Sequence, residues 1–571
     1  MKKAVFTTLI LSAQLLSAQD VLYLNNANGT YQTIDTREVK EITFNEQQEI
    51  VNIVFPGNGA QLITSCFSTR GVESIAPTKD SNVELTYNPA PAVSFNAADK
   101  NSYNEVIDNI IDDESNDESG DFVENYTTSR IITITFSENG VKTSTLPTSG
   151  ITATIDGGHI VINSTLSKTG YQITGTCSNG SLKIYSDKKF RLLFNNVNLT
   201  NPNGPAINIQ SGKTVYASIV NGSTNTICDG ATYNAPVVDS NGKEEDQKGT
   251  FFSEGQLIFD GYTNGTGTLN VTSYGGHAIC SDDYIRVRGG NINILSAAKD
   301  GFRTKEKFII GRTGTYSPKI TINATSNGIE CTEGAFIMNA GMLEINSGGE
   351  GIKVVYDEPT PDPAVTPNAT ISGGYISITT TGEKSSAIQT TGNYTQNGGI
   401  IEATVNGNGS KIINSDGTVS FLKESENQTT GKLTAFVNGT LASDTTSAGG
   451  IKCNGAFNIV DGTIAIACNG SGAKAINCDS DITIDGGTVT LLSTAENYTD
   501  IADDKKSRAI TAYGITINGG IVVAKAYDHA IAATDGTTIN GGIVNAYSET
   551  STALDYDATQ TGGWLLTIDA K

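Results

Sequence analysis

The 571-residue chain has few of the residues that several common protein classes require. It contains eight Cys, three His, three Met and one Trp. Eight thiols over this length are far below the density of a disulfide scaffold. The sequence contains no Cys-x-x-Cys pair and no phosphate-binding loop, and its few His residues suit no Ser–His–Asp triad. These absences exclude disulfide-stapled domains and the common nucleophilic and nucleotide-binding sites.

Basic residues are also scarce. Lys and Arg number 37 against 60 Asp and Glu, which gives a formal net charge of −23. Such a chain is a poor partner for nucleic acid or an anionic membrane, but it suits cation binding or solubility outside the cell. No apolar run is long enough to cross a bilayer. We therefore expect no nucleic-acid partner and no transmembrane segment.

The N-terminus has the pattern of an export signal. Lys2 and Lys3 give a positive start, residues 4–16 are mostly apolar, and Ser17-Ala18-Gln19 offers a small-residue cleavage zone. This pattern predicts a signal peptide over residues 1–18. No Cys lies at the cleavage zone, so a lipid anchor is not predicted. We expect a protein that is secreted or held at the cell surface.

Glycine is abundant, with 62 residues, and Thr, Asn and Ile alternate in short runs, as in strands joined by tight turns. From residue 130 one phrase repeats: an apolar anchor, a polar turn, a short strand, a Gly-Gly pair and another strand. Successive anchors are 21–27 residues apart, except across insertions at 359–367, 423–431 and 496–505. The anchors are Ile279, Phe302, Ile329, Ile352, Ile388, Ile412, Ile451, Ile476, Ile510, Ile531 and Leu554, with Ile207 and Phe252 upstream and an inserted loop at 229–248 between those two.

A period of this size is that of one solenoid coil. A single coil cannot bury its own inward side chains, so coils stack and share a core. Six Gly-Gly pairs supply corners of positive φ; they are at 289–290, 373–374, 398–399, 486–487, 519–520 and 541–542. The sequence therefore predicts an all-β protein whose main part is a right-handed parallel β-helix.

The repeat also sets the predicted domain limits. Residues 129–571 are predicted to form the β-helix, and residues 19–50 a small N-terminal β module. Residues 51–128 are poorly defined and include an acidic tract at 112–124 that is typical of a linker. In the repeat, Cys453 and Cys478 fall in consecutive coils. We expect buried thiols in the core there, because in-register neighbouring strands rarely give disulfide torsion angles.

Acidic residues return at the turns beside the anchors. Asp282, Asp283, Glu306 and Glu333 follow successive anchors, while Asp300 and Glu350 precede theirs. Stacked coils would bring such carboxylates to roughly 5 Å, a repulsion of about 3 kcal/mol per pair at an effective dielectric of 20. A hard divalent cation such as Ca²⁺ would relieve it. The alternative is an exposed acidic edge in which each side chain points to water, and spacing alone leaves both open.

Three motifs in these coils carry a resemblance to a known family. Ala278–Asp283 reads AICSDD, Lys299–Phe302 reads KDGF and Gly349–Lys353 reads GEGIK. The chain resembles secreted bacterial carbohydrate-binding β-helix proteins, related in fold to pectate lyases, over roughly Thr133–Asp557. The resemblance implies binding of calcium and of cell-wall polysaccharide without established catalysis. It also implies five calcium ligands: Asp282, Asp283, Asp300, Glu330 and Glu350.

Two other functions stay open. A calcium-dependent polysaccharide lyase needs a base beside the metal, and the acidic coils offer Arg286, Arg288, Arg303, Lys305 and Lys307. An adhesin-like surface protein would use the β-helix only as a spacer. The sequence favours an exported, calcium-binding β-helix, monomeric, that binds an acidic, pectin-like polysaccharide without cleaving it.

Overall fold

The structure is a computed structural model. It describes residues 21–26, 31–45, 50–56, 62–68, 72–76, 91–102, 118–238, 242–261, 265–311, 317–356, 360, 362–423, 430–499, 504–556 and 558–570. The predicted signal peptide at 1–18 and residues 112–117 of the predicted linker lie outside these ranges. The chain divides into two compact units. Unit 1 comprises residues 1–95, 418–422 and 433–571, and unit 2 comprises residues 96–417 and 423–432.

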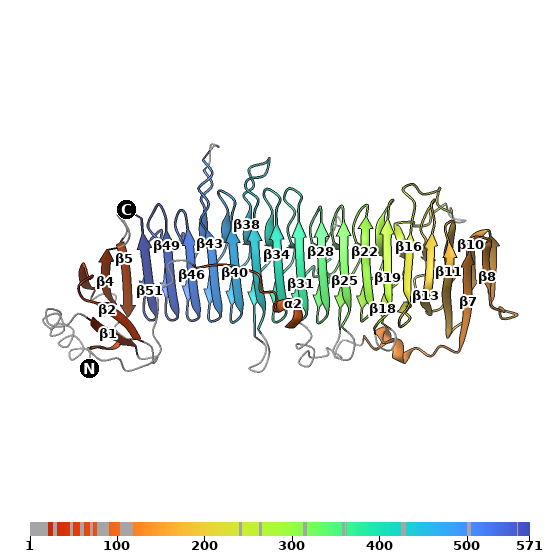
Figure 1. Cartoon of the computed structure of the whole chain (residues 1–571), viewed down its shortest axis with the longest axis horizontal. Coiled ribbons are helices and arrows are strands. Elements are labelled where there is room, and N and C mark those ends of the chain that lie inside the picture. Colours follow the sequence, from red (N-terminus) through yellow and green to blue (C-terminus); the bar gives the residue numbers. More distant parts are fainter. Residues whose placement is uncertain are drawn as a thin grey trace. The chain divides into compact units, whose positions relative to one another are not determined.

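Unit 2 is built from parallel strands that pair with every third strand along the chain (Figure 1). We name the series that carries the predicted anchors the anchor ladder. It begins with the antiparallel pair β9 (Ile151–Asp156) and β10 (Gly158–Ser164). It continues through β12 (Gly180–Ser186), β14 (Ile207–Gln210), β17 (Gly249–Ser253), β20 (His277–Ser281), β23 (Phe302–Thr304), β26 (Ile329–Cys331), β29 (Ile352–Val354), β32 (Ile388–Thr390) and β35 (Lys411–Ser415).

Two further ladders complete each coil of unit 2. They start from β7 (Arg130–Ser137), β8 (Gly140–Thr143), β11 (Thr169–Cys177) and β13 (Phe190–Thr200). The middle ladder comprises β15 (Val215–Ile219), β18 (Leu257–Asp260), β21 (Ile285–Val287), β24 (Phe308–Ile310), β27 (Phe336–Met338), β30 (Ala369–Ile371) and β33 (Tyr394–Gln396). The third ladder comprises β16 (Thr224–Cys228), β19 (Thr268–Ser273), β22 (Asn291–Ala297), β25 (Lys319–Ala324), β28 (Met342–Ser347), β31 (Tyr375–Thr380) and β34 (Ile400–Val405).

Unit 1 repeats the same arrangement. Its anchor ladder comprises β38 (Gly449–Cys453), β41 (Lys474–Cys478), β44 (Arg508–Ala512) and β47 (Ile531–Ala533). Its middle ladder comprises β36 (Val419–Phe421), β39 (Phe457–Ile459), β42 (Ile482–Ile484), β45 (Ile515–Ile517), β48 (Thr537–Ile539) and β50 (Thr559–Gln560). Its third ladder comprises β37 (Lys432–Val437), β40 (Thr463–Cys468), β43 (Thr488–Ser493), β46 (Ile521–Ala526), β49 (Ile543–Ser548) and β51 (Trp564–Asp569).

N-terminal strands cover the last rung of unit 1. β3 (Glu41–Asn45), β4 (Ile50–Pro56) and β5 (Leu62–Ser68) form an antiparallel sheet that continues onto β51. β1 (Val21–Asn26) pairs with β2 (Tyr31–Asp35) and β6 (Val72–Ala76). Leu22, Leu24 and Ile53 bury Trp564, the single Trp of the chain, together with Leu566. A solenoid end has an open strand edge, and these strands pair it and hide its apolar side chains.

Helix is almost absent from the described residues: α2 (Asp99–Ser102), η3 (Glu118–Asp121) and η4 (Val123–Asn125) span three or four residues each. No helix within the described ranges has the length and apolarity needed to cross a membrane. The predicted all-β class is thus confirmed, and the long parallel ladders are consistent with the predicted solenoid. The hand of its winding stays a prediction.

The strand register tests the predicted anchors. Ile279 pairs with Phe302, Phe302 with Ile329, and Ile329 with Ile352, and Ile451, Ile476, Ile510, Ile531 and Leu554 follow one another in unit 1. Two anchors were wrong by one residue. Phe251, not Phe252, pairs with Ile279, and Ile413, not Ile412, pairs with Ile388. Each lies in an apolar doublet, and both members are buried, so hydrophobicity cannot tell the inward residue from its neighbour.

Glycine and cysteine behave as predicted. In each of the six Gly-Gly pairs the second Gly has φ between +69° and +90°. At Gly520, moreover, a Cβ would lie 2.7 Å from the backbone of Gly486, so the corner also lacks room for a side chain. None of the eight Cys, all of which lie in the described ranges, forms a disulfide, and Cys453 and Cys478 are buried register partners in β38 and β41. Small residues therefore serve the stacking of the coils.

Candidate metal centre

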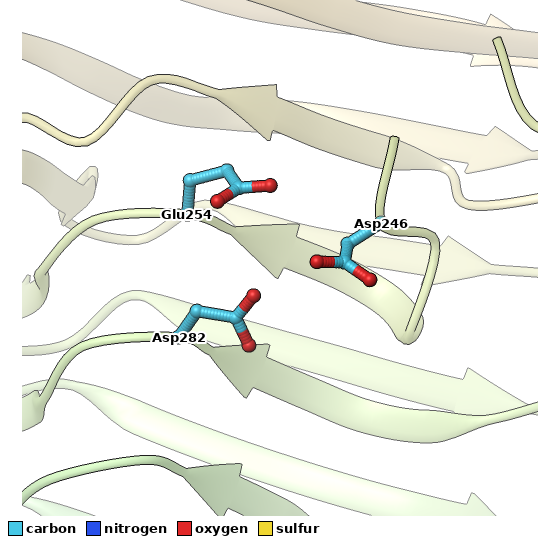
Figure 2. Close-up of side chains that lie close together, drawn as sticks. All are labelled: Asp246, Glu254 and Asp282. Carbon is cyan, nitrogen blue, oxygen red and sulfur yellow. The ribbon is translucent and has the colours of Figure 1, made fainter. Parts of the chain in front are cut away.

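Two neighbouring rungs and one inserted loop bring three carboxylates together. Ser253 pairs with Ser281, so Glu254 and Asp282, which directly follow these residues, occupy the same turn of consecutive coils. The backbone N–H of Asp282 donates to the carbonyl of Ser253 at 3.0 Å. Asp246 approaches from the inserted loop (Figure 2). One oxygen from each of the three carboxylates lies within 4.8 Å of the others. We call Asp246, Glu254 and Asp282 the acidic turn cluster.

The inserted loop is held against the outer face of the anchor ladder. Lys183 Nζ lies 2.8 Å from a carboxylate oxygen of Glu245, and the Tyr185 hydroxyl donates to the other oxygen at 2.6 Å. The side-chain amide of Gln210 donates to the carbonyl of Asp246 at 2.9 Å. These contacts fix the end of the loop and thereby place the Asp246 carboxylate beside two rungs of the solenoid.

One ammonium group contacts two of the three carboxylates. Lys248 Nζ lies 2.7 and 2.6 Å from the two oxygens of Asp282, and 3.2 Å from Asp246 Oδ2. Burial raises the pKa of Asp282, Lys248 opposes the rise, Asp246 adds to it, and the pKa lies above its ordinary value. Burial, Asp282 and Asp246 together raise the pKa of Glu254. When ionised, the three carboxylates outnumber the one ammonium group, so the cluster carries excess negative charge. Its carboxylate oxygens are the ligands that Ca²⁺ prefers.

These shifts predict how stability depends on pH. A raised folded-state pKa means that the folded protein binds the proton more tightly, so its stabilising effect is lost as pH rises. In chelator we expect the melting temperature to fall from about pH 4 to about pH 7, because Asp282 and Glu254 ionise above their ordinary pKa values of 3.8 and 4.5. Calcium should remove this decline, and Asp282→Asn should reduce it. A melting temperature that rises steadily over the same interval in chelator would contradict the expected sign.

A second acidic column runs beside the cluster. Register pairs Ser281 with Thr304 and Thr304 with Cys331, so Asp283, Glu306 and Glu333 follow at matching positions. The N–H of Glu306 donates to the carbonyl of Asp283 at 3.1 Å. Burial raises the pKa of Glu306, and the charge of Asp283 adds to it. Asp283 itself accepts from the Gln256 amide at 3.0 Å. The stacking of acidic turns predicted from the repeat is thus present in these coils.

Asp300 and Glu350, two of the five ligands that the resemblance implies, lie on the other side of the anchors. His277 Nδ1 lies 2.9 Å from Asp300 Oδ2, and the N–H of Asn327 donates to Asp300 Oδ1 at 2.9 Å. The N–H of Glu350 donates to the side-chain oxygen of Asn327 at 3.0 Å. Burial would raise the pKa of Asp300, but His277, the Asn327 N–H and Ser326 together lower it below its ordinary value. Asp300 thus already has a protein partner at each carboxylate oxygen.

Glu330 lies within a strand, between two cations. Its register partners are Arg303 and Lys353, which lie 2.9 and 2.8 Å from its two oxygens. Its side chain is 6% exposed. Of the five residues implied by the resemblance, only Asp282 belongs to a group of three acidic, His or Cys side chains close enough to share one ion, within the part of the chain that the structure describes.

The sequence interpretation missed Asp246 and Glu254. Glu254 was detectable in principle, because it lies three residues after Phe251, as Asp282 lies three after Ile279. Taking Phe252 as the anchor hid that match. Asp246 lies outside the repeat, in a loop whose path only the folded chain reveals.

Arg286 and Arg288, two of the candidate lyase bases, lie under residues 118–126, which we call the acidic strap. Arg286 Nη1 lies 3.0 Å from Asp121 Oδ2, and Arg288 Nη2 lies 2.9 Å from Glu124 Oε2. The Phe122 ring lies 4.8 Å from the Arg288 guanidinium carbon. The two arginine side chains are 6% and 4% exposed. The strap therefore withdraws both guanidinium groups from solvent.

Comparison with known proteins identifies the family of the chain. A search among curated proteins finds no match. Among solved structures, the chain is similar to a polysaccharide lyase-like protein from C. thermocellum, with 18% sequence identity and a TM-score of 0.36, over 52% of this chain and 98% of that one. A family model of carbohydrate-binding domain-containing proteins matches residues 156–497, more than half of the 571 residues. The chain therefore belongs to the family of carbohydrate-binding domain-containing proteins.

Proposed function

We propose that this protein is exported, binds calcium and holds an acidic, pectin-like polysaccharide without cleaving it. One observation carries the proposal: in a member of a carbohydrate-binding family, three carboxylates lie close enough together to share one ion, with one ammonium group beside two of them. Ca²⁺ takes six to eight oxygen ligands. Asp246, Glu254 and Asp282 would supply some of them and leave others for a uronate carboxylate. Calcium would then supply the positive charge that joins an acidic protein to an acidic polymer.

The surroundings of four of the five candidate bases, all except Lys307, support binding rather than cleavage. A lyase base must reach the proton alpha to a uronate carboxyl group. Arg286 and Arg288 are buried under the acidic strap. Arg303 is paired with Glu330, and Lys305 lies 3.1 Å from Glu333. Each of these four side chains thus already holds a carboxylate of the protein.

The test is retention on immobilised polygalacturonate, with calcium, with chelator, and with calcium added back. We expect retention with calcium, its loss on chelation, and its return. Unsaturated product, followed by ultraviolet absorbance, should not accumulate. Glu254→Gln should weaken retention about tenfold, because it removes one charged ligand. Asp156→Asn is the matched control: it makes the same charge change at an exposed position on β9, which β10, β12 and β14 separate from β17 in the anchor ladder, and it should bind as the wild type.

Other outcomes would contradict parts of this proposal. Retention that survives chelation unchanged would remove calcium from recognition. Retention on neutral but not on acidic polymers would exclude a pectin-like ligand. Release of unsaturated products would establish a lyase. Binding to no polysaccharide would favour the surface spacer.

A further inference from the structure

The first strand of the anchor ladder, β9, has a free edge. It pairs with β10 on one side, and no second strand pairs with it within the described ranges. In unit 1, by contrast, the outermost strand β51 is paired along its edge by β5. A free strand edge presents N–H and C=O groups that can pair with another chain. β9 is therefore a candidate interaction surface.

The hydrogen bonds between β9 and β10 determine which backbone groups face the free edge. The N–H of Thr165 donates to the carbonyl of Gly150 at 2.9 Å, and the register of the two strands is unbroken. In an antiparallel pair, hydrogen-bonded residues alternate with residues whose N–H and C=O groups point away from the partner strand. Even-numbered residues of β9 therefore bond to β10. The residues that direct their backbone groups to the free edge are Ile151, Ala153 and Ile155.

The same three residues turn their side chains to the core side of the sheet, and the core ends there. Ile155 and Ala153 lie opposite Ile160 and Ile162 of β10, which are fully buried. Ile155 itself is 46% exposed. In unit 1 the N-terminal strands cover the last rung and bury Trp564. The free edge of β9 thus combines outward-pointing backbone groups with apolar surface, whose removal from water is favourable.

The sequence of β9 is self-complementary. Residues 151–155 read Ile-Thr-Ala-Thr-Ile, which is the same in both directions. In an antiparallel pair of two copies with a twofold axis at Ala153, the two Ala153 residues lie opposite each other. Each Ile151 then lies opposite Ile155 of the other copy, and each Thr opposite a Thr. The outward-pointing backbone groups meet in this same register, so side chains and hydrogen bonds select one alignment.

The edge also lacks the residues that prevent such pairing. Natural edge strands avoid association through Pro, Lys or inward-pointing charges. Residues 151–155 contain none of these, whereas β8 contains Lys142. In the twofold register, Asp156 lies opposite Gly150, so no two like charges lie opposite each other. A second copy of the chain is therefore the partner that this edge fits.

We propose that β9 is the contact surface between two copies of this protein, paired antiparallel about a twofold axis at Ala153. The anchor ladder of one copy continues into that of the other. Both copies use the same surface, so the contact closes at a dimer. It requires neither calcium nor polysaccharide and is independent of the proposed function.

The size of the end face sets the expected strength of the dimer. A coil of about 23 residues, at about 3.3 Å per residue, has a perimeter of about 75 Å and encloses at most about 450 Å². Two such faces amount to about 900 Å², below the roughly 1,200–2,000 Å² of stable interfaces and within the range of weak ones. We therefore expect a dissociation constant on the order of 10 µM.

Sedimentation velocity of the mature chain, residues 19–571, tests the association in chelator. The wild type should be mostly monomeric at about 1 µM and mostly dimeric at about 100 µM. Ile155→Lys should weaken the dimer at least tenfold, because it places an ammonium group in the apolar contact. Ile131→Lys is the matched control: the same change at a 52% exposed Ile on β7, which β8 and β11 pair on both sides. It should dimerise as the wild type does.

Amide hydrogen exchange of the wild type tests the register without any substitution. The Ala153 and Ile155 amides should exchange about fivefold more slowly at about 100 µM than at about 1 µM, because about a fifth of the protein stays monomeric at the higher concentration. The Thr152 and Thr154 amides, which bond to β10, should be slow at both concentrations. An unchanged exchange rate at Ala153 would overturn the pairing.

Three sedimentation results would also overturn the proposal. The first is a wild type that stays monomeric at about 100 µM, the state expected from the sequence. The second is an equal affinity of the Ile155→Lys and Ile131→Lys variants. The third is a series of species that grows beyond the dimer with concentration, because this would show contact between unlike surfaces.

Discussion

Replacing Asp121 by alanine is expected to lower the free energy of unfolding of unit 2 by about 3–5 kcal/mol, the range found when one partner of a buried ion pair is removed. The Asp121 and Arg286 side chains are 4% and 6% exposed, and their charged atoms lie 3.0 Å apart. The Tyr284 hydroxyl also donates to Asp121. The variant would leave the Arg286 guanidinium buried without its counter-charge. Urea denaturation followed by circular dichroism measures the change.

Two further variants show whether the charge pair is responsible. In Asp121→Leu combined with Arg286→Met, both charges are gone, so most of the lost stability should return. Lys305→Met breaks an ion pair with Glu333 in the same unit, but these side chains are 47% and 20% exposed. It should change stability by less than about 1 kcal/mol. A loss of similar size for Asp121→Ala and Lys305→Met would mean that the acidic strap contributes little to the stability of unit 2.

The period of the sequence predicted most of the stacking, because each rung repeats the same physical demand. Inward positions must be apolar, and corners such as Gly520 must accept positive φ without a side chain. Those demands recur at fixed spacing, so a list of apolar residues and Gly-Gly pairs was enough to align the coils. The predicted register was wrong only at apolar doublets such as Phe251-Phe252, where the inward and the outward residue are both apolar.

The candidate site and its surroundings were harder to predict, because some of their carboxylates come from segments outside the repeat. Asp246 comes from an insertion, and Asp121 of the acidic strap precedes the first parallel strand; neither position follows from a period. The ion-pair partners of Glu330, by contrast, could have been predicted from the sequence. Arg303, Glu330 and Lys353 each follow an anchor by one residue, so stacking alone places Glu330 between two cations. Aligning every position, rather than only the acidic ones, would have shown this.

Calcium affinity is expected to change in opposite directions in two variants of the acidic turn cluster. Asp282→Asn should weaken binding about 100-fold, because it removes one charge and reduces the repulsion that a cation relieves. Lys248→Gln should strengthen binding about tenfold. At an effective dielectric of 20, two unit charges 4 Å apart interact by about 4 kcal/mol, and partial exposure and salt reduce this to about 1–2 kcal/mol. Titration calorimetry at neutral pH measures both affinities.

Lys248 makes this prediction specific to a metal site. Its Nζ lies 2.6 Å from Asp282 Oδ2, where it supplies the charge that an ion would otherwise supply. If the cluster were only a structural ion-pair network, Lys248→Gln would destabilise the protein, and calcium would not compensate. If the cluster binds calcium, the same variant is destabilised in chelator and regains its stability when calcium is added, because the ion takes over the role of the ammonium group. A Lys248→Gln variant with weaker calcium binding than the wild type would contradict the proposed centre.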